Sequence, residues 1–223
     1  MPEYAVLDKD TIKSEIMPCF SMAKRGFSSG FDLGEIVNAI LYKLRSGCQR
    51  RLLPMGYLFS GEPPSRDTVF QHYRKWSVKE EWEKAYSNIL RKNKKVIGLY
   101  ISHIDGSHTP ACRRGEQIEY QDRKKRRTTN ALFLSDNQGI PLAISESQPG
   151  NHADLYEIGQ RIGELVGQLA NAGIAVDRVF CNLDAGFDGK KLRSALMSNG
   201  IVPNVYPNPK NRGEYTGNGS MTS

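Results

Sequence analysis

Two aspartates stand at the ends of two apolar segments of the sequence. Asp105 follows the run Val96–Ile104, and Asp184 follows the run Val176–Leu183. Two carboxylates held close together repel each other unless a divalent cation lies between them. Mg²⁺ is commonly bound by one or two carboxylates together with the phosphate oxygens of a substrate. The pair therefore suggests a metal site that acts on a phosphodiester.

Each aspartate also has a purely structural explanation. An Asp-Gly pair such as Asp105-Gly106 is common in turns. Asp184 could simply cap a helix that follows it, although Asp188 is better placed to do so. Only the pairing of the two carboxylates, in a suitable order of strands, favours the metal site over these alternatives.

The composition is that of an ordinary globular protein with a basic surface. The chain has 223 residues, of which 39% are hydrophobic and 25% are charged, enough to bury one large core or two small ones. The formal net charge of +7 suits a polyanionic partner such as nucleic acid, although many cytosolic proteins carry as much.

The cysteines and the N-terminus indicate a cytoplasmic protein. Cys19, Cys48, Cys112 and Cys181 are widely spaced, without a Cys-x-x-Cys pair, which argues against a zinc ribbon and against a disulfide framework. The first residues lack the basic and apolar segments of a signal peptide, and no apolar run is long enough to span a membrane. We expect a protein that is neither exported nor membrane-spanning.

Residues 1–92 have the apolar spacing of helices and predict an all-α domain. A first helix is expected to start at a capping box of Asp32 and Glu35 and to stop at Gly47, and a third at a capping box of Ser77 and Glu80. The apolar face of the first helix consists of Leu33, Ile36, Val37, Ile40, Leu41 and Leu44.

Between these two, Ser65 can cap a short helix with mixed basic and amide side chains. Its expected core face is Val69, Phe70, Tyr73 and Trp76. Such a helix resembles the reading helix of a helix-turn-helix domain. A plain three-helix bundle with a solvated face is the favoured alternative, because Arg and Lys are common on helix surfaces. The candidate DNA contacts on its outer face are Arg66, Gln71, Arg74 and Lys75.

After residue 95 the apolar pattern changes to that of strands alternating with helices. The predicted order is β-β-β-α-β-α-β over residues 96–206, which is typical of an α/β ribonuclease-H-like mixed sheet. The expected strands are Val96–Ile104, Thr128–Ser135, Ile140–Ser145, Val176–Leu183 and Ile201–Tyr206; the expected helices run from Asn151 to Gly173 and from Asp188 to Asn199.

This order brings the two aspartates together. A crossover helix returns the fourth strand parallel to the first, so neighbouring strands would place Asp105 and Asp184 at one carboxyl edge. Metal ions held there could activate a water or a 3′-hydroxyl and stabilise the leaving oxygen of an in-line displacement.

Several segments are similar, in the same order along the chain, to DDE transposases of bacterial insertion sequences, in particular the "insertion sequence five/four" group. The stretch from Asp184 to Pro203 resembles their second-acid motif, Asp-x-Gly-aromatic-Asp followed by Leu-Arg. The other similar segments are Ile104–Ser107, Arg123–Asn130, Gln138–Leu142, Ile40–Tyr42, Leu44–Gln49 and Arg51–Pro54.

The resemblance implies a helical DNA-binding domain followed by a ribonuclease-H-like catalytic domain. It implies Mg²⁺- or Mn²⁺-dependent cleavage and strand transfer at the terminal inverted repeats of double-stranded DNA, at the bacterial nucleoid. It carries Asp105 and Asp184 over as the first two catalytic, metal-binding acids. The oligomeric state stays open, a homodimer included.

Basic residues follow the first acid and are further candidates for contact with the DNA backbone. A solvated basic loop is the alternative. We read His103 as structural; His108 is close enough to Asp105 in the sequence for a contact with DNA or metal, but a structural role is the favoured reading. The basic residues are Arg113, Arg114, Arg123, Lys124, Lys125, Arg126 and Arg127.

Two features depart from the family pattern. Arg50 occupies a position where the family usually has Trp, so we expect looser packing of the helical domain. The family's third acid lies on a helix after the fifth strand, whereas residues 207–223 are rich in Pro and Gly, predict disorder and contain only Glu214, which we do not expect to be a ligand. These departures predict a truncated remnant that does not cleave DNA alone; the alternative is an inactive DNA-binding protein or repressor.

Overall fold

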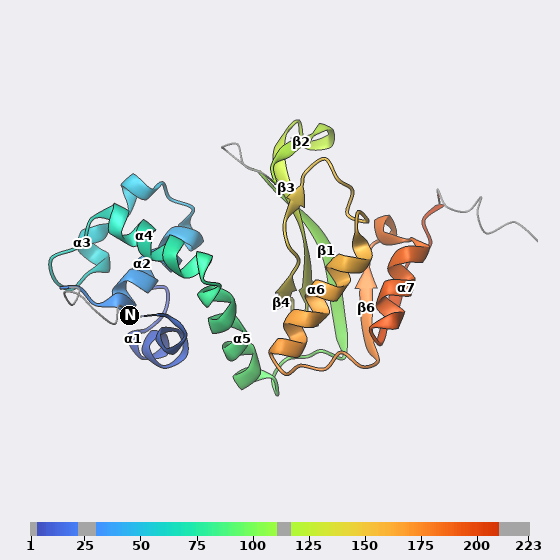
Figure 1. The fold of residues 1–223 in the computed structure, drawn as a ribbon, viewed down its shortest axis with the longest axis horizontal. Coiled ribbons are helices and arrows are strands. Elements are labelled where there is room, and N and C mark those ends of the chain that lie inside the picture. The colour runs from blue at the N-terminus through green and yellow to red at the C-terminus, as the bar shows by residue number, and fades with distance from the viewer. Residues whose placement is uncertain (1–3, 22–29, 111–116, 210–223) are drawn as a thin grey trace, which may run out of the picture. The chain divides into compact units, whose positions relative to one another are not determined.

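The computed structural model describes residues 4–21, 30–110 and 117–209. The chain divides into two compact units, Met1–Ile89 and Leu90–Ser223, and the boundary falls within helix α5 (Figure 1). None of the described helices has the length and apolar character needed to cross a membrane.

The described part of the first unit is helical. Its central helix, α2, begins after Asp32, whose carboxylate accepts a hydrogen bond from the Gly34 N–H, and ends at Gly47 with φ 64°. The helices are α1 (Lys9–Thr11), α2 (Leu33–Ser46), α3 (Met55–Leu58), α4 (Arg66–Val78) and α5 (Glu81–Asn93), with a π-helical segment at Ile12–Ile16 and 3₁₀ turns at Met17–Cys19 and Arg50–Leu52.

Two expected capping boxes are not formed. Glu35 is buried and bonds to Lys9 at 2.8 Å and to the Ser60 N–H at 3.3 Å instead of returning to Asp32. Helix α4 continues through Ser77, whose hydroxyl donates to the Tyr73 carbonyl at 2.9 Å. The chain breaks instead at Glu80, whose φ is 55°, because the left-handed conformation cannot continue a helix.

Helix α4 buries less of its apolar face than its spacing predicts. Ser65 caps it as expected, by accepting a hydrogen bond from the Thr68 N–H at 3.1 Å. Val69 and Trp76 are buried, and Trp76 stacks on Phe20 with ring centroids 4.4 Å apart. Phe70 and Tyr73, expected in the core, are partly exposed.

The second unit is built on a mixed sheet. Strand β1 is antiparallel to β3 and parallel to β6, which is parallel to β7, giving the order β2-β3-β1-β6-β7, while β4 and β5 also pair with β3. The strands are β1 (Ile101–Pro110), β2 (Glu119–Gln121), β3 (Arg126–Ser135), β4 (Pro141–Ile144), β5 (Gln148–Pro149), β6 (Val179–Leu183) and β7 (Ile201–Val205).

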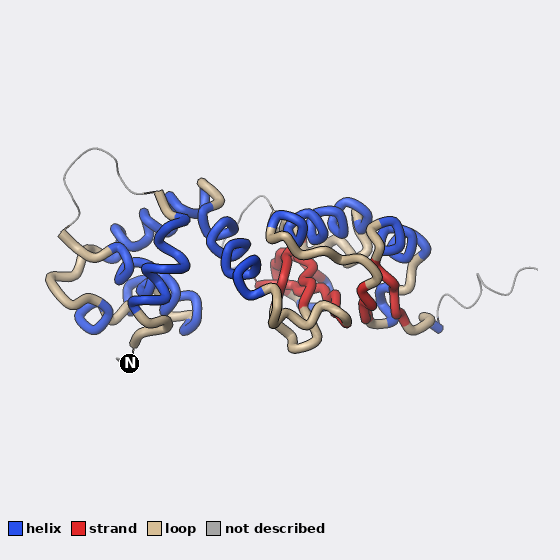
Figure 2. Tube along the Cα trace, turned by 90° about the horizontal axis from the view of Figure 1, so that it is seen from below, coloured by secondary structure: helices blue, strands red, loops and turns tan. Residues whose placement is uncertain are grey.

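Two helices, α6 (Ile158–Asn171) and α7 (Lys190–Ser198), pack against each other and lie on one side of the sheet (Figures 1 and 2). The core lies between them and the sheet. Its fully buried members include Leu132 and Leu134 from β3, Ile162 and Leu169 from α6, and Leu192 from α7.

Some boundaries differ from those predicted. Strand β1 begins at Ile101 and continues to Pro110, so Asp105 lies within the strand rather than at its end. Its second half has no apolar run and is a strand because it pairs with β3 as far as Pro110 with Thr128. Helix α6 begins at Ile158, not at Asn151, because residues 150–157 form turns that pack on β3 and β1.

Candidate active site

Asp105, within β1, and Asp184, directly after β6, lie two residues beyond the last register pair of these neighbouring strands. The parallel register of β1 and β6 pairs His103 with Asn182, and each aspartate follows two residues later. Neighbouring strands are about 4.8 Å apart, and register partners in a parallel pair point to the same face. The backbone therefore aligns the two carboxylates side by side.

Both carboxylates point away from α6 and α7. Along β1, Ser102 and Ile104 are buried whereas His103 and Asp105 are exposed, and along β6 Leu183 is buried whereas Asp184 is exposed. Side chains alternate along a strand, and the buried set packs under the helices. The pair consequently faces the open side of the sheet, accessible to a large substrate.

Each aspartate uses one carboxylate oxygen to order its own backbone. Oδ1 of Asp105 accepts from the Gly106 N–H at 2.8 Å, and Oδ1 of Asp184 accepts from the Gly186 N–H at 2.8 Å, which caps the 3₁₀ turn Ala185–Phe187. Among the described residues, the second oxygen of each makes no hydrogen bond. These two oxygens are therefore free to act as metal ligands.

The donor set fits a hard divalent cation. Two carboxylates with free oxygens on an open face suit Mg²⁺ or Mn²⁺, which complete their coordination with water and substrate phosphate. Within residues 4–21, 30–110 and 117–209, no group of three or more His, Cys, Asp or Glu side chains is arranged to hold a metal. The pair alone is therefore the candidate, with Asp105 and Asp184 as its ligands.

An apolar row borders the site on the same face. Ile101, Phe180 and Val202 pair across β1, β6 and β7, and their side chains are 37%, 42% and 40% exposed. Between this row and the aspartates lies a polar row in which the Asn204 amide donates to the Asn182 side chain at 2.8 Å.

Asp188 does not serve as the helix cap that the sequence suggests. The N-cap of α7 is Gly189, and the buried Asp188 carboxylate accepts from the Asn208 N–H at 2.8 Å and pairs with Arg193 at 2.8 Å. The hydrogen bond from Asn208 and the Arg193 guanidinium hold the pKa of Asp188 below its ordinary value. Asp188 therefore stabilises the turn after Asp184 as a carboxylate.

His108 lies on the face of β1 opposite Asp105, which argues against a contact between His108 and a metal held by Asp105. It shares a face of β1 with Gly106 and Ile104, and it contacts the loop that precedes α6. Its ring nitrogens approach Gln121 at 3.2 Å, Thr128 at 3.5 Å and Asp154 at 3.6 Å. Burial lowers the pKa of His108, and the Asp154 carboxylate offsets part of that shift.

Five exposed basic residues, Arg123–Arg127, form the turn into β3 and its first positions. Phe133 pairs with Asp105, so Arg127, six residues earlier, shares its face at a distance of about 20 Å along the strand. Arg126 points to the other face, and Lys124 donates to the His108 carbonyl at 3.1 Å. Arg113 and Arg114 lie outside the described residues.

The candidate DNA contacts of α4 fall on two faces of the helix. Gln71, Arg74 and Lys75 are spaced i, i+3 and i+4 and share a face. Arg66 is spaced i, i+4 with Phe70 on the neighbouring face, and its guanidinium donates to the Leu53 carbonyl at 3.2 Å. This hydrogen bond helps to hold α4 in place, so Arg66 has a structural role in addition to any contact with DNA.

Arg50, which stands where the family pattern has Trp, packs against helix α4. Its guanidinium lies 5.0 Å from the centre of the Phe70 ring and 3.0 Å from the Asp67 carboxylate. Together with Arg66 and Tyr73, Arg50 and Phe70 line a small cavity of about 140 Å³ beside α2.

The sequence reasoning missed Asp154 and its partners. Asn130 donates to the Asp154 carboxylate at 2.8 Å, and the buried Arg161 donates to the Asp154 carbonyl at 3.1 Å. The sequence predicts a helix that begins at Asn151, whereas α6 begins seven residues later and leaves Asn151–Asp154 in turns.

No protein-family model and no curated protein matches this chain. Among solved structures, a piggyBac transposase synaptic complex with hairpin DNA is 12% identical over 95% of this chain and 51% of that one, with a TM-score of 0.45. The Mos1 transposase paired-end complex with the left transposon end is 14% identical over 87% of this chain and 64% of that one, with a TM-score of 0.34.

A simian T-cell lymphotropic virus intasome in complex with the PP2A regulatory subunit B56 gamma is 13% identical over 53% of this chain and 38% of that one, with a TM-score of 0.31. The chain thus spans less than two thirds of each of these proteins.

Proposed function

We propose that this chain is a transposase of a bacterial insertion sequence, with a ribonuclease-H-like catalytic domain that uses Asp105 and Asp184. The observation that carries the proposal is the register of β1 and β6, which aligns these two carboxylates on one open face. The motifs around both acids resemble those of DDE transposases and support the same assignment.

The chain's own residues divide the work of such a reaction. The free oxygens of Asp105 and Asp184 would hold the cation, and the register of β1 and β6 would set the separation of these oxygens. Mg²⁺ or Mn²⁺, when bound, would act as a Lewis acid on the phosphodiester and lower the pKa of the attacking water or 3′-hydroxyl. Arg127, on the same face, binds a phosphate several nucleotides away and thereby orients the strand.

In this proposal the helical unit binds the terminal inverted repeats. Gln71, Arg74 and Lys75 form the contact surface on α4, and Arg123–Arg127 add sequence-independent phosphate contacts. Amide and guanidinium groups on one helix face are suited to reading base edges in a major groove.

Metal binding tests the site directly. Mn²⁺ should raise the melting temperature of the wild-type protein, because the ion binds only the folded state. At a free Mn²⁺ concentration one hundred times the Kd, the folded state should be stabilised by about 2.7 kcal/mol. Asp105→Asn and Asp184→Asn should each abolish this rise, and should stabilise the metal-free protein slightly by removing repulsion between the carboxylates. The measurement is thermal unfolding with and without Mn²⁺.

Asp177→Asn is the matched control, because Asp177 is an exposed carboxylate near the opposite end of β6. It should leave the Mn²⁺ response unchanged. An undiminished response in Asp184→Asn would refute the assignment. Strand cleavage of a terminal-repeat duplex then separates the two functions: cleavage that needs both aspartates marks a transposase, and binding without cleavage marks a DNA-binding protein derived from one.

A further inference from the structure

Gly106, the residue directly after Asp105, leaves space that another carboxylate fills. A Cβ at position 106 would lie 2.5 Å from Oδ1 and 2.6 Å from Cγ of Asp154. No side chain tolerates such a contact, so glycine is required for Asp154 to approach the β1 backbone. The contact is on the face of β1 opposite the Asp105 side chain.

Asp154 is held firmly against that backbone. The Asn130 amide, fully buried on β3, donates to Asp154 Oδ1 at 2.8 Å, and His108 Nε2 lies 3.6 Å from the same oxygen. The Arg161 guanidinium, 3% exposed on α6, donates to the Asp154 carbonyl at 3.1 Å. A carboxylate fixed by groups from β1, β3 and α6 has little freedom to move.

The loop that carries Asp154 is also docked at its other end. The Gly150 N–H donates to the Thr128 carbonyl at 3.0 Å, and Gly150 itself lies tightly against Thr128. Residues 148–154 therefore cross β3 and end on β1, under the position from which Asp105 projects.

The contact reaches Asp105 through a single peptide unit. Asp105 Oδ1 accepts a hydrogen bond from the Gly106 N–H. Asp154 packs against Gly106 on the opposite face of β1. A shift of Gly106 moves both that N–H and the carboxylate bound to it. Groups that orient metal ligands in this way typically change metal affinity by about 10- to 100-fold when they are removed.

We infer that Asp154 is a positioning residue for the metal site: its carboxylate, held by Asn130 and seated on Gly106, fixes the backbone from which Asp105 presents its oxygens. The inference rests on the proposed function of Asp105 and Asp184. A merely structural Asp154 would change the stability of the fold and leave the metal affinity of the folded protein unchanged.

The experiment is a titration of the full chain with Mn²⁺, with free Mn²⁺ measured by electron paramagnetic resonance. Asp154→Ala should raise the Kd for Mn²⁺ about tenfold. Asp154→Asn should stay within about twofold of wild type, because its amide oxygen still accepts from Asn130. Gly106→Ala should raise the Kd about tenfold or more, because its methyl group collides with Asp154.

A double variant isolates the contact. Gly106→Ala combined with Asp154→Ala should bind Mn²⁺ no more weakly than Asp154→Ala alone, since the methyl group then meets no carboxylate. Circular dichroism confirms that each variant is folded. If Asp154→Ala does not fold, Gly106→Ala and Asp154→Asn decide the question by the same expectations.

The outcomes separate this inference from the proposed function. Wild-type Mn²⁺ affinity in Asp154→Ala or in Gly106→Ala, with binding lost in Asp184→Asn, overturns the role of Asp154 and leaves the metal site standing. Absence of Mn²⁺ binding by the wild type, or undiminished binding by Asp184→Asn, overturns both.

Discussion

The guanidinium of Arg50 connects the 3₁₀ turn before α3 to the surface of α4. It stacks over Phe70 at 5.0 Å and pairs with Asp67 at 3.0 Å. A partly exposed cation–π contact contributes about 0.5–1 kcal/mol to stability, whereas an exposed ion pair can contribute only about 0.2 kcal/mol. The ring contact is therefore the larger of the two effects.

Arg50→Ala should lower the free energy of unfolding of the helical unit by about 1 kcal/mol. Arg51→Ala is the control: it removes the same charge from the next residue, which is exposed and whose side chain forms no hydrogen bond or ion pair with the described residues. It should change the free energy by less than about 0.5 kcal/mol. Urea unfolding followed by tryptophan fluorescence measures both, because Trp76 and Trp82 lie in this unit; equal losses would contradict the role of the stacking.

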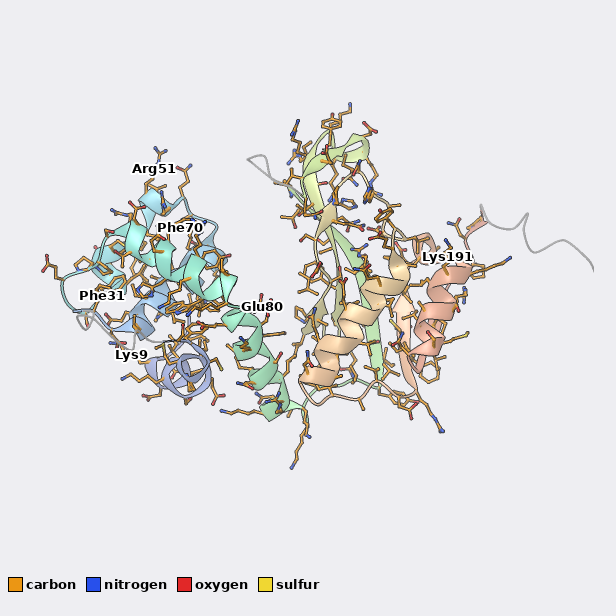
Figure 3. All side chains as sticks on the ribbon, in the orientation of Figure 1. Lys9, Phe31, Arg51, Phe70, Glu80 and Lys191 are labelled. Atoms are coloured by element: carbon orange, nitrogen blue, oxygen red, sulfur yellow. The ribbon has the colours of Figure 1, made fainter. Side chains whose placement is uncertain are left out.

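At the scale of elements, the junction of α4 and α5 depends on one residue in an unfavourable conformation. Glu80 has φ 55° and links the last turn of α4 to the first residue of α5 (Figure 3). A non-glycine residue in the left-handed region costs about 1–2 kcal/mol. Because Glu80 is exposed, its side chain contributes little that would compensate for this cost.

Glu80→Gly should therefore stabilise the protein by about 0.5–1 kcal/mol, since glycine adopts this conformation without strain. Glu83→Gly, three residues later on the exposed surface of α5, should destabilise it by about 1 kcal/mol through lost helix propensity. Opposite signs in thermal unfolding are the expected result. Destabilisation by both substitutions would show that the Glu80 side chain supports the junction.

Elements that depend on their own apolar spacing could be predicted from the sequence, and those that depend on a partner could not. The stop of α2 at Gly47 and the faces of α6 and α7 follow from local pattern. The second half of β1 and the short strands β2 and β5 have no apolar alternation and exist because β3 lies beside them.

The same distinction applies to the candidate site. Asp105 and Asp184 could be proposed because each follows a recognisable apolar segment. Asp154 could not, because its role arises from a contact across 48 residues of sequence, with a glycine that has no side chain to signal it. The prediction also ended the strand at Ile104, whereas the strand continues and its alternation turns His108 to the face opposite Asp105.

At the scale of the whole molecule, the net charge of +7 suits any polyanion. The basic side chains proposed for binding lie on α4 in one unit and on the turn into β3 in the other. Binding that uses both should depend strongly on salt, because each neutralised phosphate releases counterions.

Affinity for a terminal-repeat duplex should fall steeply between about 50 and 200 mM salt. Arg74→Ala should weaken binding and reduce the dependence of log K on log salt by about one contact. Lys13→Ala, which removes an exposed cation from the same unit outside α4, should change neither by a comparable amount. Fluorescence anisotropy on repeat and scrambled duplexes measures this; equal affinity for both at every salt concentration would contradict sequence reading by α4.

The register of β6 couples the site to the hydrophobic core. Val179, Cys181 and Leu183 are buried, and the residues between them carry Phe180, Asn182 and then Asp184 to the open face. A slip of one residue would exchange the two faces, moving the aspartate under the helices and three apolar side chains into solvent. The chain cannot lose the alignment of its acids by strand slippage without also losing its core. Substitutions that preserve the folding of this sheet should therefore also preserve the geometry of the pair.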